Sequence, residues 1–179
     1  NSKVKQIELN REKSTYYITL SNNEVLSASN LIISTGLHKP WIPEIPGIEL
    51  VDSYCDMDLD WSAYNNKRVL ILGKGNSAFE TAEELIEHAS MIHMCSPNSL
   101  RFAWSTHYVG HVRAVNNNFL DTYHLKSQNA VLDAEVLSIV KTEKGEFKVK
   151  IAYQHAENEI EEIVYDKVIA CTGFRFNTE

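Results

Sequence analysis

A glycine loop at residues 73–78 has the residue types and spacing that could bind a dinucleotide. An apolar run, Val69–Leu72, leads into the pattern Gly-x-Gly-x-x-Ala, and a helical pattern follows. Gly73 permits a tight turn off a strand, and Gly75 lets the backbone approach a pyrophosphate without a Cβ in the way. Free N–H groups at the start of the helix attract phosphate. The pattern predicts a βαβ unit that binds a nicotinamide dinucleotide. The expected contact residues are Gly73, Gly75, Asn76, Ser77 and Ala78.

The helix after this loop is amphipathic. Ala78, Ala82, Leu85 and Ile86 fall on one stripe, with the spacing of a helix that packs against a sheet. Its glutamates are expected on the opposite, solvated face, at Glu80, Glu83, Glu84 and Glu87.

The strand expected next, Ser90–Cys95, ends without an acidic residue. In NAD-binding units a carboxylate about 20 residues past the first glycine bonds the ribose 2′-hydroxyl. This sequence has no Asp or Glu between Glu87 and Asp121. A carboxylate would repel a 2′-phosphate, whereas Ser96 and Arg101 are the nearest groups that could bind one. The sequence therefore favours NADP(H) over NAD(H).

Two stretches of the chain, 4–36 and 136–173, share one layout. Each has two short alternating strands separated by a polar turn, a polar third element, and an apolar run that ends in Thr-Gly. The alternation predicts a three-stranded antiparallel meander with one solvated face. The final runs, Leu31–Gly36 and Val168–Gly173, predict strands buried in a parallel sheet. Chance similarity between meanders is the alternative, but the matching ends favour two dinucleotide-binding domains in tandem, the first without its front half.

Composition limits the range of partners. The net charge is −7, from 17 basic and 24 acidic residues, which argues against nucleic acid and anionic membrane surfaces. No apolar run reaches the length of about 20 residues that spans a bilayer. The three cysteines, Cys55, Cys95 and Cys171, form no C-x-x-C pair, so neither a redox dithiol nor a metal site is expected within the chain, and the thiols are expected to be buried or inert.

This arrangement resembles the flavoprotein oxidoreductases that carry two dinucleotide-binding domains. In that family an FAD domain is interrupted by an inserted NAD(P) domain, and each domain closes on a strand ending in Ala/Cys-Thr-Gly. The Pro-rich segment His38–Gly47 resembles the crossover between them. The resemblance implies an α/β fold, in which a Rossmann-like NAD(P)-binding domain (a parallel sheet with an antiparallel β-meander) is inserted in a partial FAD-binding domain. It also implies that Thr35 and Gly36 close the FAD domain, and that Thr172 and Gly173 lie at the NADP(H) site.

The resemblance divides the chain into four parts. Residues 1–40 are expected to be the C-terminal part of the first FAD-domain segment, and 41–66 a Pro-rich connector. Residues 67–173 are expected to form the NADP(H)-binding domain, and 174–179 to begin the return to the FAD domain. The flavin-binding glycine loop is expected upstream of Asn1, so the FAD site would lie mostly outside this chain, and the chain alone would be inactive.

Within the family, the glycine loop is most similar to that of the flavin-containing monooxygenase branch. The segments Gly75–Glu83, Thr106–His111 and Asn116–Ser127 resemble an endoplasmic-reticulum group of that branch. This implies a location in the endoplasmic-reticulum lumen and electron transfer toward thiol–disulfide oxidoreductase partners in glycoprotein quality control. The monooxygenase fingerprint F-x-G-x-x-x-H does not follow Pro46-Gly47, which argues against substrate oxygenation.

Three functions remain open. The favoured one is the NADP(H)-binding portion of an FAD-dependent oxidoreductase, with hydride transfer from NADPH to the flavin. The others are a flavin-dependent monooxygenase and a non-catalytic domain that binds NADPH as a structural ligand. No residue of this chain is expected to be catalytic, although His107, His111 and Arg113 could line the cleft between the two cofactors.

Overall fold

The computed structural model describes residues 2–123, 129–156 and 159–176. The chain forms two compact units, Asn1–Gly36 and Leu37–Glu179, which are described separately. Within the described residues, no helix combines the length and apolarity required to cross a membrane.

The first unit is a three-stranded antiparallel meander with the order β1-β2-β3. Its strands are β1 (Val4–Asn10), β2 (Thr15–Leu20) and β3 (Val25–Ala28). The meander confirms the alternation read from the sequence. The strand expected at Leu31–Gly36 is wrong, because this segment has no regular structure and Ile32 is 89% exposed. A buried parallel strand needs paired neighbours on both sides, and the described residues of this unit supply none.

The second unit is built on a seven-stranded mixed sheet with the order β10-β9-β8-β7-β6-β11-β5. The strands from β5 to β8 in that order are parallel, and β8, β9 and β10 are antiparallel. The sheet strands are β5 (Asp52–Ser53), β6 (Arg68–Leu72), β7 (Met91–Ser96), β8 (Val131–Lys141), β9 (Phe147–Tyr153), β10 (Ile160–Tyr165) and β11 (Lys167–Ala170). The other elements are β4 (Leu37–Pro40), α1 (Asn76–Leu85), α2 (Ala103–Thr106) and β12 (Phe174–Phe176), with 3₁₀ turns at Ile48–Leu50, Trp61–Tyr64 and Ala114–Asn116 and a π-helical turn at Phe119–Tyr123.

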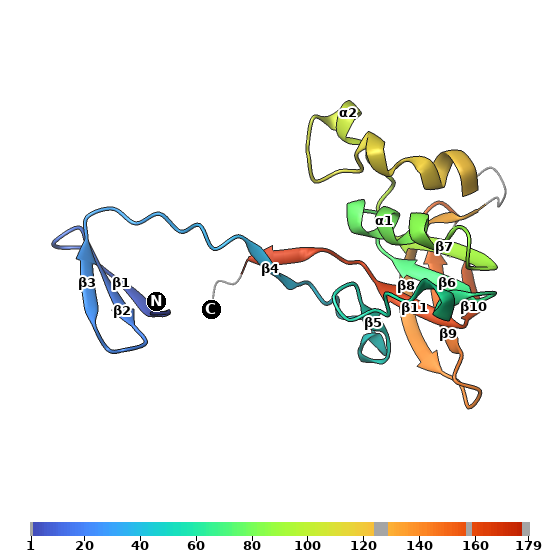
Figure 1. Cartoon of the computed structure of the whole chain (residues 1–179), viewed down its shortest axis with the longest axis horizontal. Helices are drawn as coiled ribbons and strands as arrows, with labels where there is room; N and C mark the ends of the chain where they lie inside the picture. Colours follow the sequence, from blue (N-terminus) through green and yellow to red (C-terminus); the bar gives the residue numbers. More distant parts are fainter. Residues whose placement is uncertain (1, 124–128, 157–158, 177–179) are drawn as a thin grey trace. The chain divides into compact units, whose positions relative to one another are not determined.

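Strand β6 is the centre of the fold because it is buried on both faces. Val69 and Ile71 pack with Phe79 and other residues of α1, whereas Leu70 and Leu72 pack with the β8–β10 meander. Figure 1 shows α1 beside the parallel strands, with the segment that contains α2 beyond it. The result is the α/β, Rossmann-like architecture with an antiparallel meander that the sequence predicts.

The segment between β7 and β8 covers the outer side of α1. Phe79 of α1 meets Phe119 edge to face, with ring centroids 6.1 Å apart. The Tyr123 hydroxyl accepts a hydrogen bond from the Ile92 amide of β7 at 2.7 Å. Helix α1 is therefore packed on two sides, which explains why Phe79 is buried beyond the stripe predicted from the sequence. Thr81 is buried as well, with its hydroxyl against Cys171 and Met57.

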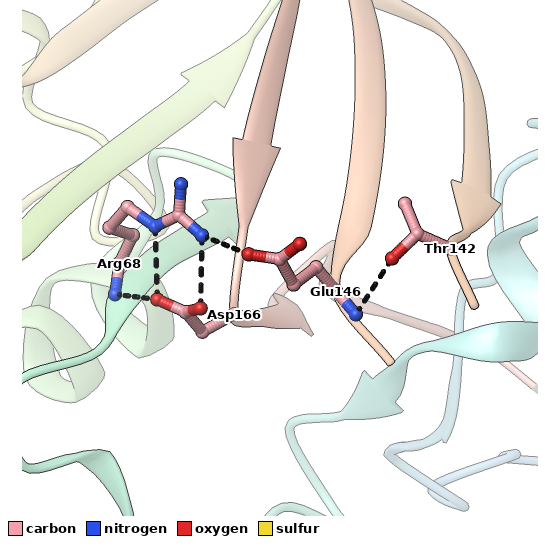
Figure 2. A network of polar contacts seen from close by, with 4 residues as sticks. All are labelled: Arg68, Thr142, Glu146 and Asp166. Atoms are coloured by element: carbon pink, nitrogen blue, oxygen red, sulfur yellow. Dashed lines mark hydrogen bonds and ion pairs between the residues drawn. The ribbon is translucent and has the colours of Figure 1, made fainter. Parts of the chain in front are cut away.

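A charged network ties the amino end of β6 to the meander (Figure 2). The Arg68 guanidinium donates to both carboxylate oxygens of Asp166, at 3.0 and 3.1 Å, and to Glu146 at 2.7 Å. The Arg68 amide also donates to Asp166 at 2.7 Å, and the Glu146 amide donates to the Thr142 hydroxyl at 3.2 Å. These contacts fix the β8–β9 and β10–β11 turns to β6, at the amino end of that strand.

Two segments far apart in sequence form a short antiparallel ladder, which Figure 1 shows as β4 beside β12. Pro40 pairs with Phe174, and just inside the ladder the Trp41 amide donates to the Gly173 carbonyl at 2.9 Å. The chain therefore enters and leaves the body of the second unit at the same place.

Candidate functional site

A cavity of about 780 Å³ lies at the carboxyl ends of the parallel strands. Leu72 ends β6 and Gly73 follows it, Cys95 and Ser96 end β7, and Cys171 follows β11. In the sheet, β7 and β11 lie on opposite sides of β6, so the chain reverses its direction of winding at β6. In open α/β sheets ligands bind outside the carboxyl ends of strands at such a switch point. The cavity therefore lies where this fold places a ligand.

The two glycines of the loop differ in what surrounds them. Gly73 has φ +128°, and an added Cβ would lie 2.2 Å from the carbonyl oxygen of Cys171. Gly75 has an ordinary φ of −93°, and an added Cβ would meet no protein atom within 4 Å. Gly73 is thus required by the close approach of β6 and β11, while Gly75 leaves open space at the first residue before α1. This space leaves the backbone at the start of α1 open to a ligand.

The side chains of the next three residues point to structural roles. Asn76 donates from Nδ2 to the His111 carbonyl at 2.9 Å, and its Oδ1 accepts from the Arg113 amide at 3.0 Å. Ala78 is fully buried, and Ser77 is partly buried. Neither these two nor Asn76 lines the 780 Å³ cavity. What remains for Asn76, Ser77 and Ala78 at a ligand is their backbone N–H groups in the first turn of α1.

Ser96 and Arg101 both line the cavity, as does the loop between them. The Ser96 hydroxyl donates to the Asn98 carbonyl at 3.2 Å, which holds the turn after β7. Arg101 is exposed, and its carbonyl accepts from the Val112 amide at 3.1 Å. The sequence predicted that both residues bind a 2′-phosphate, and the structure places both in the lining of the cavity.

Lys74 is a cavity residue that the sequence reasoning missed. Its side chain is only 4% exposed, and its ammonium forms an ion pair with Asp133 and donates to the Leu132 carbonyl at 3.0 Å. The other Asp133 oxygen accepts from the Ser99 hydroxyl at 2.8 Å. Burial raises the pKa of Asp133, but the hydrogen bonds from Lys74 and Ser99 outweigh it and hold that pKa below its usual range. Asp133 lies 59 residues from Lys74, so no local pattern signals the pair.

Thr172 and Gly173 lie where β11 leaves the sheet, and both line the cavity. The Thr172 hydroxyl donates to the Trp41 carbonyl, so this side chain holds the β4 segment against the β11 end. Gly173 has φ +93°, and an added Cβ there would meet nothing within 4 Å. A ligand would therefore meet the backbone at Gly173, while the Thr172 hydroxyl is already engaged.

Thr35 and Gly36 belong to the first unit and lie in its irregular, exposed segment. Gly36 has φ +69° with no protein atom near an added Cβ. Their expected role in closing an FAD domain stays a prediction.

Of the two histidines expected near the cofactors, one lines the cavity and the other does not. His111 lines the cavity beside Gly110, and its Nδ1 lies 2.6 Å from the Thr106 hydroxyl. His107 is exposed and outside the cavity lining. Arg113 pairs instead with Glu80 of α1 at 3.3 Å, and Asn116 donates to the same glutamate at 3.0 Å. The Glu80 side chain remains 41% exposed, as expected for the solvated face, but the segment after β7 also folds against it and supplies these two partners. Of the predicted segment Asn116–Ser127, residues 124–127 lie outside the described residues.

The cysteines are free thiols of two kinds. Cys95 and Cys171 are buried, and burial raises the pKa of each to about 12. Cys55 is exposed, so the expectation that the thiols are buried or inert is met by burial at Cys95 and Cys171 only, and the inertness of Cys55 stays a prediction. Across the ranges that the structure describes, no cluster of three or more His, Cys, Asp or Glu side chains is arranged to hold a metal ion.

Comparison with known proteins agrees with this geometry. The family described as pyridine nucleotide-disulphide oxidoreductase matches residues 1–179. FAD-dependent oxidoreductase domain-containing protein 2 of Mus musculus is 38% identical over 181 residues, which cover 90% of this chain and 27% of that protein. This chain thus spans about a quarter of the length of that relative.

Two solved structures share the fold at low identity. The FAD-bound cadaverine monooxygenase of desferrioxamine biosynthesis from Erwinia amylovora has a TM-score of 0.70 and 16% identity, over 100% of this chain and 53% of that chain. The bacillithiol disulfide reductase of Staphylococcus aureus has a TM-score of 0.65 and 19% identity, over 98% of this chain and 49% of that chain. At such identities the likeness concerns the fold alone.

Proposed function

Because this chain belongs to the pyridine nucleotide-disulphide oxidoreductase family, we propose that its second unit is the NADP(H)-binding domain of an FAD-dependent oxidoreductase. The observation that carries the proposal is the 780 Å³ cavity at the switch point, with the open space at Gly75 directly before α1. The residues proposed to hold the nucleotide are Gly73, Gly75, Asn76, Ser77, Ala78, Ser96, Arg101, Thr172 and Gly173.

The first 40 residues are proposed to be part of an FAD domain interrupted by this NADP(H) domain. The ladder of β4 and β12 supports an inserted domain, because both connections run side by side. Apolar side chains on the meander support a role in a larger domain, since Val4, Leu9 and Val25 are 48–57% exposed. The mouse relative is itself named for FAD dependence.

The chemistry that the bound cofactors would supply is transfer of a hydride from NADPH to the flavin. This chain's contribution is to position the nucleotide. The first turn of α1 directs N–H groups at the pyrophosphate, and the short glycine loop lets the backbone come close. Ser96 and Arg101 would bind the 2′-phosphate, with Arg101 as the charged donor.

The test uses the full-length protein. Purified protein should be yellow, and NADPH added without oxygen should bleach the flavin absorbance more efficiently than NADH does. Arg101→Ala should weaken NADPH binding far more than NADH binding. Arg113→Ala is the matched control, because this exposed arginine lies outside the cavity lining and should leave both affinities unchanged. Equal losses for both nucleotides in Arg101→Ala would remove the assigned 2′-phosphate site.

The electron acceptor is proposed to be a thiol–disulfide partner in endoplasmic-reticulum quality control. The three cysteines of the described residues are free thiols and form no C-x-x-C pair, so the relay cysteines are proposed to come from elsewhere in the protein or from the partner. NADPH consumption that requires a disulfide acceptor supports this reading. Oxygen-dependent oxidation of a small nucleophile would instead identify a monooxygenase. A colourless protein that binds NADPH without oxidising it would identify a non-catalytic scaffold.

A further inference from the structure

The carboxylate beside the turn after β7 comes from β8. Asp133 is the register partner of Ser96, the last residue of β7. Its Oδ2 accepts from the Ser99 hydroxyl at 2.8 Å. The sequence between β7 and the next helix lacks acidic residues, but the fold places the carboxylate of Asp133 beside this turn. This carboxylate lies close to the wall assigned to the 2′-phosphate.

The charge of Asp133 is balanced by Lys74. Lys74 occupies the middle position of the glycine loop, and its buried ammonium forms an ion pair with Asp133. A second bond from the ammonium, to the Leu132 carbonyl at 3.0 Å, leaves one of its three donors for other partners. Lys74 and Ser99 line the cavity, whereas Asp133 is not part of its lining.

No other described partner of Asp133 is comparably placed. His155 approaches the same carboxylate at 3.4 Å but is 75% exposed, so solvent screens this pair. Two other carboxylates line the cavity, Glu44 and Glu135, and both are exposed. Buried charges are screened much less than exposed ones, so the buried Lys74 ammonium is the charge that most effectively offsets Asp133.

We propose that Lys74 is a specificity-determining residue, which makes the site accept a 2′-phosphorylated nucleotide by neutralising Asp133. This inference rests on the proposed function. Without Lys74, a free carboxylate would lie behind Ser99. It would repel the 2′-phosphate of NADPH and leave NADH, which lacks that phosphate, little affected.

The test measures dissociation constants of NADP⁺ and NAD⁺ for the full-length protein by titration calorimetry, as the measure of the preference for NADPH over NADH. The oxidised nucleotides cannot reduce the flavin, so the readout does not depend on turnover. Lys74→Met should lower the preference for NADPH over NADH by about tenfold or more, the effect of one unpaired charge at an effective dielectric of about 20. Asp133→Asn should raise that preference. The double variant Lys74→Met/Asp133→Asn should return it to near the wild-type value.

The double variant separates this role from two others. If Lys74 binds the phosphate directly, the double variant keeps the low preference, and the inference is overturned. If the pair is only structural, all variants lose affinity for both nucleotides equally, which also overturns it. If Lys74→Met does not fold, the sign of the change in Asp133→Asn decides, and a lowered preference rejects the inference. A wild-type protein that binds neither nucleotide, or prefers NADH, overturns the proposed function as well.

Discussion

The two loop glycines allow a matched experiment, because alanine should impair nucleotide binding at Gly75 and folding stability at Gly73. At Gly75 the backbone is extended and an added Cβ meets no protein atom. Gly75→Ala should therefore change the free energy of unfolding by less than about 1 kcal/mol. The new methyl group would occupy the space assigned to the pyrophosphate. NADPH affinity should fall at least about tenfold, which corresponds to about 1.4 kcal/mol.

At Gly73 alanine should damage the fold itself. The backbone has φ +128°, and an added Cβ would lie 2.2 Å from the Cys171 carbonyl oxygen. A left-handed conformation costs about 1–3 kcal/mol in a non-glycine residue, and forced packing costs about 1–3 kcal/mol more. Gly73→Ala should thus lose about 2–6 kcal/mol, a large part of a typical folding free energy of about 5–15 kcal/mol.

The assay combines denaturant unfolding with NADPH titration of the full-length protein. Gly145→Ala is the control, because Gly145 also has positive φ, +81°, but open space around an added Cβ. It should show the backbone cost alone, about 1–3 kcal/mol, with NADPH binding intact. Unchanged NADPH affinity in Gly75→Ala would refute the position assigned to the pyrophosphate. A Gly73→Ala protein no less stable than Gly145→Ala would refute the close β6–β11 contact.

Three further predictions concern the rest of the second unit. Hydrogen bonds from Arg68 lower the pKa of Asp166 to about 2, so the stability that ionised Asp166 contributes is complete above about pH 4 and is lost as the pH falls toward 2. Asp166→Asn should lower the free energy of unfolding by about 1–2 kcal/mol at pH 7, and should make that free energy depend less on pH between about 4 and 2. Glu80→Ala removes one of the two acceptors of the Asn116 amide, the other being Asn76, and should cost about 1 kcal/mol. Faster amide exchange should be confined to the segment after α2, and uniformly faster exchange would contradict the contact. Of the three cysteines, a thiol reagent applied to the native protein should modify only Cys55, as read by mass spectrometry; rapid labelling of all three would show that the two burials are wrong.

Local patterns predicted the elements that are packed within their own neighbourhood. The run Val69–Leu72 and the glycine loop became β6, a tight turn and α1, because each step there is determined by adjacent residues. The meander of β8, β9 and β10 followed from alternation for the same reason. The strand expected at Leu31–Gly36 did not form, because a parallel strand depends on neighbours that this unit does not provide.

Contacts between distant segments set the site chemistry, and these could not be read from spacing. The segment after β7 has no acidic residue, as the sequence shows. The carboxylate of Asp133, from β8, nevertheless lies beside that turn and accepts a hydrogen bond from Ser99. The orientation of the Asn76 side chain could not be predicted from the sequence either, because it is set by a hydrogen bond to the carbonyl of His111. Lys74 was missed for the same reason, because its burial and its pairing with Asp133 depend on a residue of β8 that is distant in the sequence.

The ladder of β4 and β12 joins two connections of the second unit that are far apart in the sequence. Its inner end is tied by the Trp41 amide to Gly173 and by the Thr172 hydroxyl to Trp41, and these same three residues line the cavity. A single strand can swivel about its own bonds, whereas two hydrogen-bonded strands must twist or bend together. The hydrogen bonds at the inner end of the ladder therefore also fix the position of three residues in the cavity lining, so the ladder and the cavity share one structural element.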